Sequence, residues 1–95
     1  MELICRIAKQ HPLQTRHYTD RNGQPQAFTS VGLTLTSGTD SLYAEITGEQ
    51  AVKCGTMEDK YYYKVDLSAR AESWQDSQGQ ERCGTRLYVN RIAVL

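Results

Sequence analysis

Residues 61–94 read YYYKVDLSARAESWQDSQGQERCGTRLYVNRIAV. Over residues 61–74, apolar or aromatic side chains alternate with polar ones, which is the two-residue period of a β-strand. A polar loop, residues 75–80, separates this strand from a last strand over residues 82–94. The alternation of the last strand slips near residues 90–91, as it does where a β-bulge inserts one extra residue. This stretch therefore predicts two long strands and a mainly β protein.

The same period appears upstream, where three more strands are predicted. The first covers residues 2–13, and Pro12 marks the end of its regular pairing because proline has no N–H to donate. Residues 20–23, DRNG, form a strong turn signal, since Asn and Gly tolerate the positive φ of tight turns. Strands over residues 26–36 and 41–47 follow.

Each predicted strand has an apolar face. In the first three strands these faces carry Leu3, Cys5, Ile7, Val31, Leu33, Leu35, Leu42, Ala44 and Ile46. In the fourth strand one side carries Tyr61, Tyr63, Val65, Leu67, Ala69 and Ala71, and the other carries Tyr62, Lys64, Asp66, Arg70 and Trp74. The tyrosine run at 61–63 is expected mostly in the core and at the sheet edge.

One short helix is predicted between the third and fourth strands. The alternation stops over residues 49–60, and residues 49–53 can form one or two helical turns that Gly55 ends. Five strands with a short helical link in this place follow the order of an OB-fold. We expect an all-β OB-fold, a five-stranded Greek-key barrel with at most one short helix, as a single domain over residues 1–95; an SH3-like barrel or a half-sandwich could use similar strands.

Composition places the chain among ordinary globular proteins. It has 95 residues, of which 39% are hydrophobic and 23% charged. No apolar run is long enough to cross a membrane as a helix, and no secretory signal pattern is present, so a cytoplasmic protein is expected. Eleven basic and eleven acidic residues cancel, so any affinity for nucleic acid must come from a local patch.

Cysteine and histidine usage argues against a disulfide framework and against a zinc site. Cys5, Cys54 and Cys83 are odd in number and contain no CxxC pair, and His11 and His17 lie far in sequence from two of them. No His, Cys and acidic residues cluster at nucleophile or ligand spacing, and no phosphate-cradling glycine loop is present. We therefore expect a protein that is not an enzyme and holds no metal and no cofactor.

The segment 74–85, WQDSQGQERCGT, resembles the strand-loop-strand segment of the bacterial single-stranded-DNA-binding protein family, because its Trp, Asp, Gly and Arg fall at that family's spacing. Weaker likenesses cover nearly the whole chain. They are Pro12, Arg16, Tyr18, Thr19, Asn22 and Gly23 before the second strand, and Gly48 after the third.

The resemblance implies sequence-tolerant binding of single-stranded DNA, with bases stacked on aromatic rings and cations along the phosphates. Trp74 matches a family position that stacks on DNA. Arg70 and Lys64 share its face, and Phe28 and Tyr43 point outward from the second and third strands. The predicted nucleic-acid-binding residues are Trp74, Arg70, Lys64, Phe28, Tyr43, Arg82 and Arg86.

Each assignment has a structural alternative. Trp74 could cap the open end of the barrel or pack in a dimer interface, and the aromatic residues could be rim packing. Asp66, Glu72 and Asp76 lie close to the cations and could neutralise them. The alternative function is an OB-fold protein-interaction module, a primosome or oligomer-assembly component with little DNA affinity of its own.

The chain also departs from the family. Ser41, Thr47 and Cys83 stand where the family has aromatic residues, so binding is weaker than in the family or Phe28 and Tyr43 have taken over. We expect a protein without the family's acidic recruitment tail, and this shortness resembles that of primosomal replication proteins of the same fold. We expect a homodimer or homotetramer that acts in DNA replication, repair, recombination or the transfer of a plasmid or mobile element.

Overall fold

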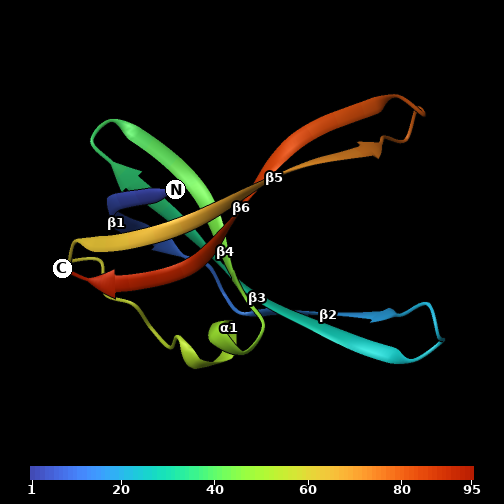
Figure 1. The fold of residues 1–95 in the computed structure, drawn as a ribbon, viewed down its shortest axis with the longest axis horizontal. Coiled ribbons are helices and arrows are strands. Elements are labelled where there is room, and N and C mark those ends of the chain that lie inside the picture. The colour runs from blue at the N-terminus through green and yellow to red at the C-terminus, as the bar shows by residue number, and fades with distance from the viewer.

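The computed structural model describes residues 1–95 (Figure 1). Its elements are β1 (Glu2–Gln10), β2 (Gln14–Thr19), β3 (Pro25–Ser37), β4 (Asp40–Thr47), α1 (Glu49–Lys53), β5 (Tyr63–Gln75) and β6 (Glu81–Val94). The six strands form one sheet in the order β1-β5-β6-β4-β3-β2, and an additional pairing of β1 with β3 closes it into a barrel. The predicted all-β OB-fold with one short helix is confirmed.

The strand count differs from the prediction at one place. β1 ends at Gln10, and the segment Gln14–Thr19 forms a further strand that pairs with β3. All six residues of β2 are exposed, so the segment has no buried face that an apolar alternation could reveal. His11 N donates to Gly32 O at 2.8 Å, so hydrogen bonding to β3 continues into the segment between β1 and β2.

The core lies inside the barrel and matches the predicted apolar faces over most of their length. The buried residues are Cys5, Ile7, Val31, Leu33, Leu35, Ala44, Ile46, Ala51, Tyr63, Val65, Leu67 and Val89. The apolar side that the sequence predicts for residues 61–71 is buried only at Tyr63, Val65 and Leu67. Ala69 and Ala71 are exposed because β5 leaves the barrel after Leu67, and Tyr61 lies before β5.

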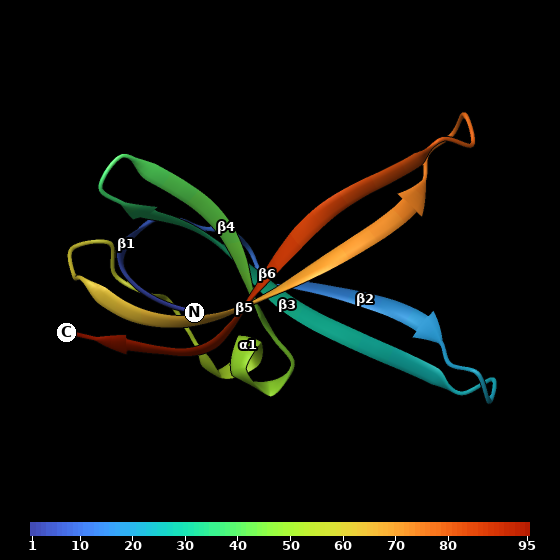
Figure 2. The same cartoon turned by 45° about the horizontal axis from the view of Figure 1, so that its top comes forward.

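Two hairpin arms project from the barrel. The β2–β3 arm pairs residues 14–19 with 25–30, and the β5–β6 arm pairs residues 69–75 with 81–87. Figure 1 shows both arms extending to the right of the barrel, and Figure 2 shows that they stay apart when the molecule is turned. In the sheet, β4 lies between β3 of one arm and β6 of the other.

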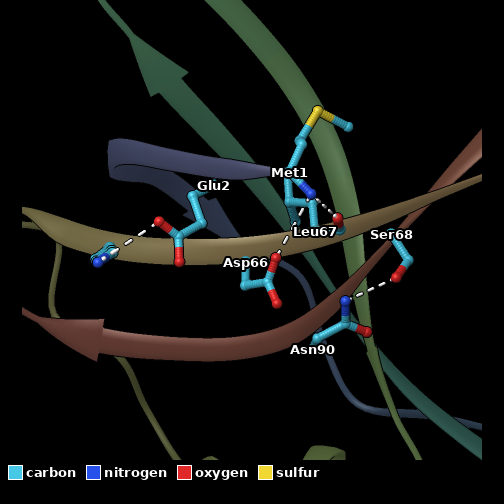
Figure 3. Close-up of polar contacts among 7 residues, drawn as sticks. Met1, Glu2, Asp66, Leu67, Ser68 and Asn90 are labelled. Atoms are coloured by element: carbon cyan, nitrogen blue, oxygen red, sulfur yellow. Dashed lines mark hydrogen bonds and ion pairs between the residues drawn. The ribbon is translucent and has the colours of Figure 1, made fainter.

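A β-bulge marks the point where β5 and β6 leave the barrel. Asp66 is paired with Arg91 and Leu67 with Val89, so Asn90 is the extra residue, as the slipped alternation predicts. Figure 3 shows Asn90 Nδ2 donating to Ser68 Oγ at 2.7 Å. In the same view the Met1 amino group donates to Leu67 O at 2.7 Å and lies 3.5 Å from Asp66 Oδ1.

Candidate nucleic-acid interface

One continuous outer face runs across β3, β4, β6 and β5. Leu42, Ala44 and Ile46 of β4 point inward, so Tyr43 and Glu45 point outward. The single pairing between β4 and β6 joins Glu45 to Tyr88 and continues this face across the barrel. Cross-strand pairs of the β5–β6 arm extend it further, since directly paired residues share a face. We call outer face the surface formed by Phe28, Gly32, Tyr43, Glu45, Arg70, Glu72, Trp74, Arg82, Gly84, Arg86 and Tyr88.

Trp74 lies on the β5–β6 arm with one side of its ring against the sheet. A methyl group at Gly84 would lie 3.2 Å from Trp74 Cη2 and 3.3 Å from Cζ3, so the indole rests on the glycine backbone. The side chain is 49% exposed. Gly84 thus seats the ring on the arm while leaving much of the ring open to solvent.

Tyr43 is seated in the same way on β4. The hydroxyl end of its ring lies over Gly32, where an added methyl group would overlap the ring hydroxyl and come within 2.6 Å of Cζ. The His11 ring meets Tyr43 edge-on at 5.4 Å between ring centroids, and His11 Nε2 lies 3.0 Å from Thr34 Oγ1. Tyr43 is 51% exposed, so it too presents open ring surface on a supported side chain.

Phe28 occupies the other arm. It is paired with Arg16 across the β2–β3 arm and is 39% exposed. The three predicted aromatic residues are therefore spread over both arms and the strand between them. Trp74 and Phe28 lie on the two arms, and Tyr43 lies on β4, which separates β6 from β3 in the sheet.

The arginines of the outer face differ in their partners. Arg82 Nε donates to Asp76 Oδ2 at 3.0 Å, and Arg86 Nε donates to Glu72 Oε1 at 2.9 Å. Hydrogen bonds to the Glu72 carboxylate and then to Tyr88 raise the pKa of Arg86 above its ordinary value. Neighbouring carboxylates thus neutralise these two arginines, which is the alternative that the sequence left open.

Arg70 has no carboxylate partner. Its guanidinium carbon lies 5.8 Å from the centre of the Tyr88 ring, a cation–π contact that leaves the charge uncompensated by an anion. Asp66, another expected neutralising group, lies instead beside the Met1 amino group.

Lys64 is set apart from the other predicted residues. Its Nζ lies 3.6 Å from Glu2 Oε2. Its backbone is paired with Ile4 and Ala93 in the part of the sheet that forms the barrel. At about 3.3 Å per residue, it is roughly 20 Å from Arg70 along β5. The structure brings six of the seven predicted residues onto the outer face and leaves Lys64 at the opposite end of its strand.

A hollow of 460 Å³ opens between β4 and β6 on the outer face. It is lined by Tyr43, Glu45, Thr85, Arg86 and Leu87. No role for Glu45 was predicted from the sequence. The seating glycines were missed as well, although an isolated glycine inside a strand is a signal for close approach of another group.

No group of three or more His, Cys, Asp or Glu side chains is positioned to hold a metal ion. Cys5 is buried, Cys54 half-buried and Cys83 exposed, and burial raises the pKa of the Cys5 thiol. The structure contains no helix with the length and apolar character needed to cross a membrane.

Comparison with known proteins gives a relationship of fold. No protein-family model matches the sequence, and no curated protein matches it. Among solved structures, the crystal structure of a mitochondrial single-stranded DNA binding protein from S. cerevisiae is similar, with a TM-score of 0.56 and 14% sequence identity. The match covers 100% of this chain and 92% of that chain. Along its whole length, this chain is therefore similar in fold to that protein.

Proposed function

We propose that this chain binds single-stranded DNA with little sequence preference along most of the strand. The observation that carries the proposal is the outer face, which combines glycine-seated aromatic rings with the arginines of the β5–β6 arm. In an OB-fold this face and the two flanking loops are the usual place for an oligonucleotide. The fold likeness to a single-stranded DNA binding protein supports the same assignment.

Base stacking supplies most of the affinity in this proposal. Unstacked bases lie on the open surfaces of Trp74, Tyr43 and Phe28, and each stacked base contributes ~1–3 kcal/mol whatever its identity. A ring already held against a glycine loses little side-chain entropy when a base covers it, because its rotamer is restricted before binding. Trp74 and Tyr43 meet this condition.

The arginines follow the phosphates. Arg70 has no anionic partner and is available at once. Arg82 and Arg86 contact a phosphate either in place of their carboxylate partners or together with them. The cost is small because exposed ion pairs contribute only about 0–1 kcal/mol. Lys64 contributes only if the bound DNA strand continues around the barrel.

The wider setting is part of the proposal. The exposed outer edges of the two arms favour self-association, so we propose a homodimer or homotetramer. We place the protein in the cytoplasm, without enzymatic activity or cofactor, in DNA replication, repair, recombination or the transfer of a plasmid or mobile element.

Fluorescence anisotropy of a labelled mixed-sequence oligonucleotide tests the proposal. A length of about 35 nucleotides exceeds the roughly 4–16 that one OB-fold covers. We expect Trp74→Ala to raise Kd by roughly 5- to 150-fold, which corresponds to the loss of one stacked base. Tyr61→Ala is the matched control, because Tyr61 is 42% exposed but lies before β5 and off the outer face. No binding by the wild type at low salt would reject the proposal.

A protein-interaction module is the second candidate. The balanced charge of the chain and the internal pairing of Arg82 and Arg86 favour it, since both reduce attraction for a polyanion. In this case Trp74→Ala changes the oligomer mass in light scattering, and no oligonucleotide competes for the surface.

A further inference from the structure

The hollow between β4 and β6 combines three kinds of group around one space. Tyr43 offers an aromatic ring, Glu45 a carboxylate and Arg86 a guanidinium, with Thr85 and Leu87 completing the lining. Its volume of 460 Å³ falls in the range of small-molecule sites, about 300–1,000 Å³. The two strands that form it are joined at a single pairing, Glu45 to Tyr88, so the space between them is open to a ligand.

Glu45 is the unusual member of this group. It is half-buried, and no ion pair or side-chain hydrogen bond to another residue of the protein engages its carboxylate. The cation that shares the hollow, Arg86, gives its Nε to Glu72, and it attracts Glu45 without a hydrogen bond between them. A carboxylate with no hydrogen-bonding partner in the middle of a face that binds a polyanion repels the phosphates. It is useful there only if it accepts hydrogen bonds from the ligand.

The bases differ in what they offer to such an acceptor. Cytosine, adenine and guanine each carry an exocyclic amino group, and a Glu or Asp side chain accepts from the N4 amino group of cytosine in known recognition. Thymine carries a carbonyl oxygen, O4, at the corresponding place. A carboxylate therefore attracts the amino-bearing bases and opposes the O4 of thymine or uracil.

We propose that the hollow receives one base with an exocyclic amino group, and that Glu45 makes this single position selective. The base stacks on Tyr43, its amino group donates to Glu45, and an acceptor on its edge receives a hydrogen bond from Arg86. The inference rests on the proposed binding of single-stranded DNA and adds selectivity at one nucleotide, while stacking elsewhere stays tolerant of sequence.

Oligo-dC and oligo-dU of about 35 nucleotides test this selectivity. Both bases are pyrimidines of similar size, and neither carries a 5-methyl group. They differ in the amino or carbonyl group at C4 and in N3, which accepts a hydrogen bond in cytosine and donates one in uracil. For the wild type we expect oligo-dC to bind roughly 5- to 150-fold more tightly than oligo-dU, the usual discrimination of one well-placed base contact. In Glu45→Gln the ratio falls toward one, because a side-chain amide both accepts and donates.

The matched control is Glu81→Gln, which removes the same charge at an exposed position of β6 that does not line the hollow. It should leave the ratio of oligo-dC to oligo-dU affinity unchanged. Equal affinities of the wild type for the two oligomers would overturn the inference while leaving the proposed function intact. An equal gain for both oligomers in Glu45→Gln would also overturn it, since Glu45 would then only repel phosphates. Failure of both oligomers to bind at low salt would instead reject the proposed function.

Discussion

Two glycines inside strands, Gly32 and Gly84, lie under aromatic rings of the outer face. Neither has a positive φ, so the backbone there does not require glycine. What requires it is space, because a methyl group at either position would press on Tyr43 or Trp74. At the residue scale the outer face therefore contains two pairs of an aromatic ring and a glycine, and a substitution at the glycine can displace the ring.

Gly84→Ala tests this seating. The added methyl group lies 3.2 Å from Trp74 Cη2, so we expect the ring to shift by a few tenths of an ångström, with a change in tryptophan emission and weaker DNA binding. The free energy of unfolding should change by less than about 1 kcal/mol, because alanine also lowers the entropy of the unfolded chain. Gly32→Ala displaces Tyr43 further and should weaken binding more. Unchanged Kd in both variants would show that ring seating is irrelevant to binding.

At the scale of elements, both arms end in the same five-residue turn. DRNGQ at residues 20–24 and DSQGQ at residues 76–80 share Asp at the first position, Gly at the fourth and Gln at the fifth. Asp20 Oδ1 accepts from Asn22 N and Gln24 N, both at 2.9 Å, and Asp76 Oδ1 accepts from the equivalent amides. The aspartate carboxylate thus organises each tip.

Asp76→Ala should loosen the β5–β6 arm and leave the barrel intact. The Gln80 amide and then the Arg82 guanidinium lower the pKa of Asp76 below its ordinary 3.8. A lowered pKa means that the carboxylate stabilises the folded tip above pH 3.8, and that this contribution is lost as the pH falls through the lower folded value. NMR titration should give an Asp76 midpoint below 3.8, with the Gln80 amide shift following it. A midpoint at or above 3.8 would contradict this role.

For the whole molecule, the net charge is zero, but basic side chains gather on one face. The chain is neutral, so long-range attraction to DNA is weak. The outer face nevertheless gathers three arginines from β5 and β6, and of these only Arg70 has no carboxylate partner. The electrostatic attraction to DNA should therefore act over a short range and involve few phosphate contacts.

The salt dependence of DNA binding measures this number of contacts. Each phosphate contact to a single strand contributes a slope of about −0.7 in log K against log salt, so three arginines give roughly −2 for each bound chain. Arg70→Ala should reduce the slope by about 0.7. Lys53→Ala is the control, because Lys53 lies on α1 and pairs with Glu49. A slope that Arg70→Ala leaves unchanged would exclude a phosphate contact at that residue.

Much of the fold was predictable because it depends on local chemistry. The two-residue period located the barrel strands, the Asn-Gly pair located the turn before β3, and the short break in alternation located α1 at residues 49–53. The bulge at Asn90 was visible as a slip in the same period. Each of these features is set by neighbouring residues, whose side chains alternate or whose backbone must turn.

Alternation also identified which residues share a face, and it therefore placed six of the seven predicted residues on the outer face. It could not say where a strand leaves the barrel, because that depends on how far the other strands extend. Tertiary pairing decided that Ala69 and Ala71 lie on an exposed arm, and that Lys64 lies in the barrel part of β5 whereas Arg70 lies on the arm. It also decided, through the long-range pairing of Glu45 with Tyr88, that Tyr43, Glu45 and Arg86 line one hollow. The sequence by itself determined the strands and their faces, and only the closure of the sheet placed those faces beside one another.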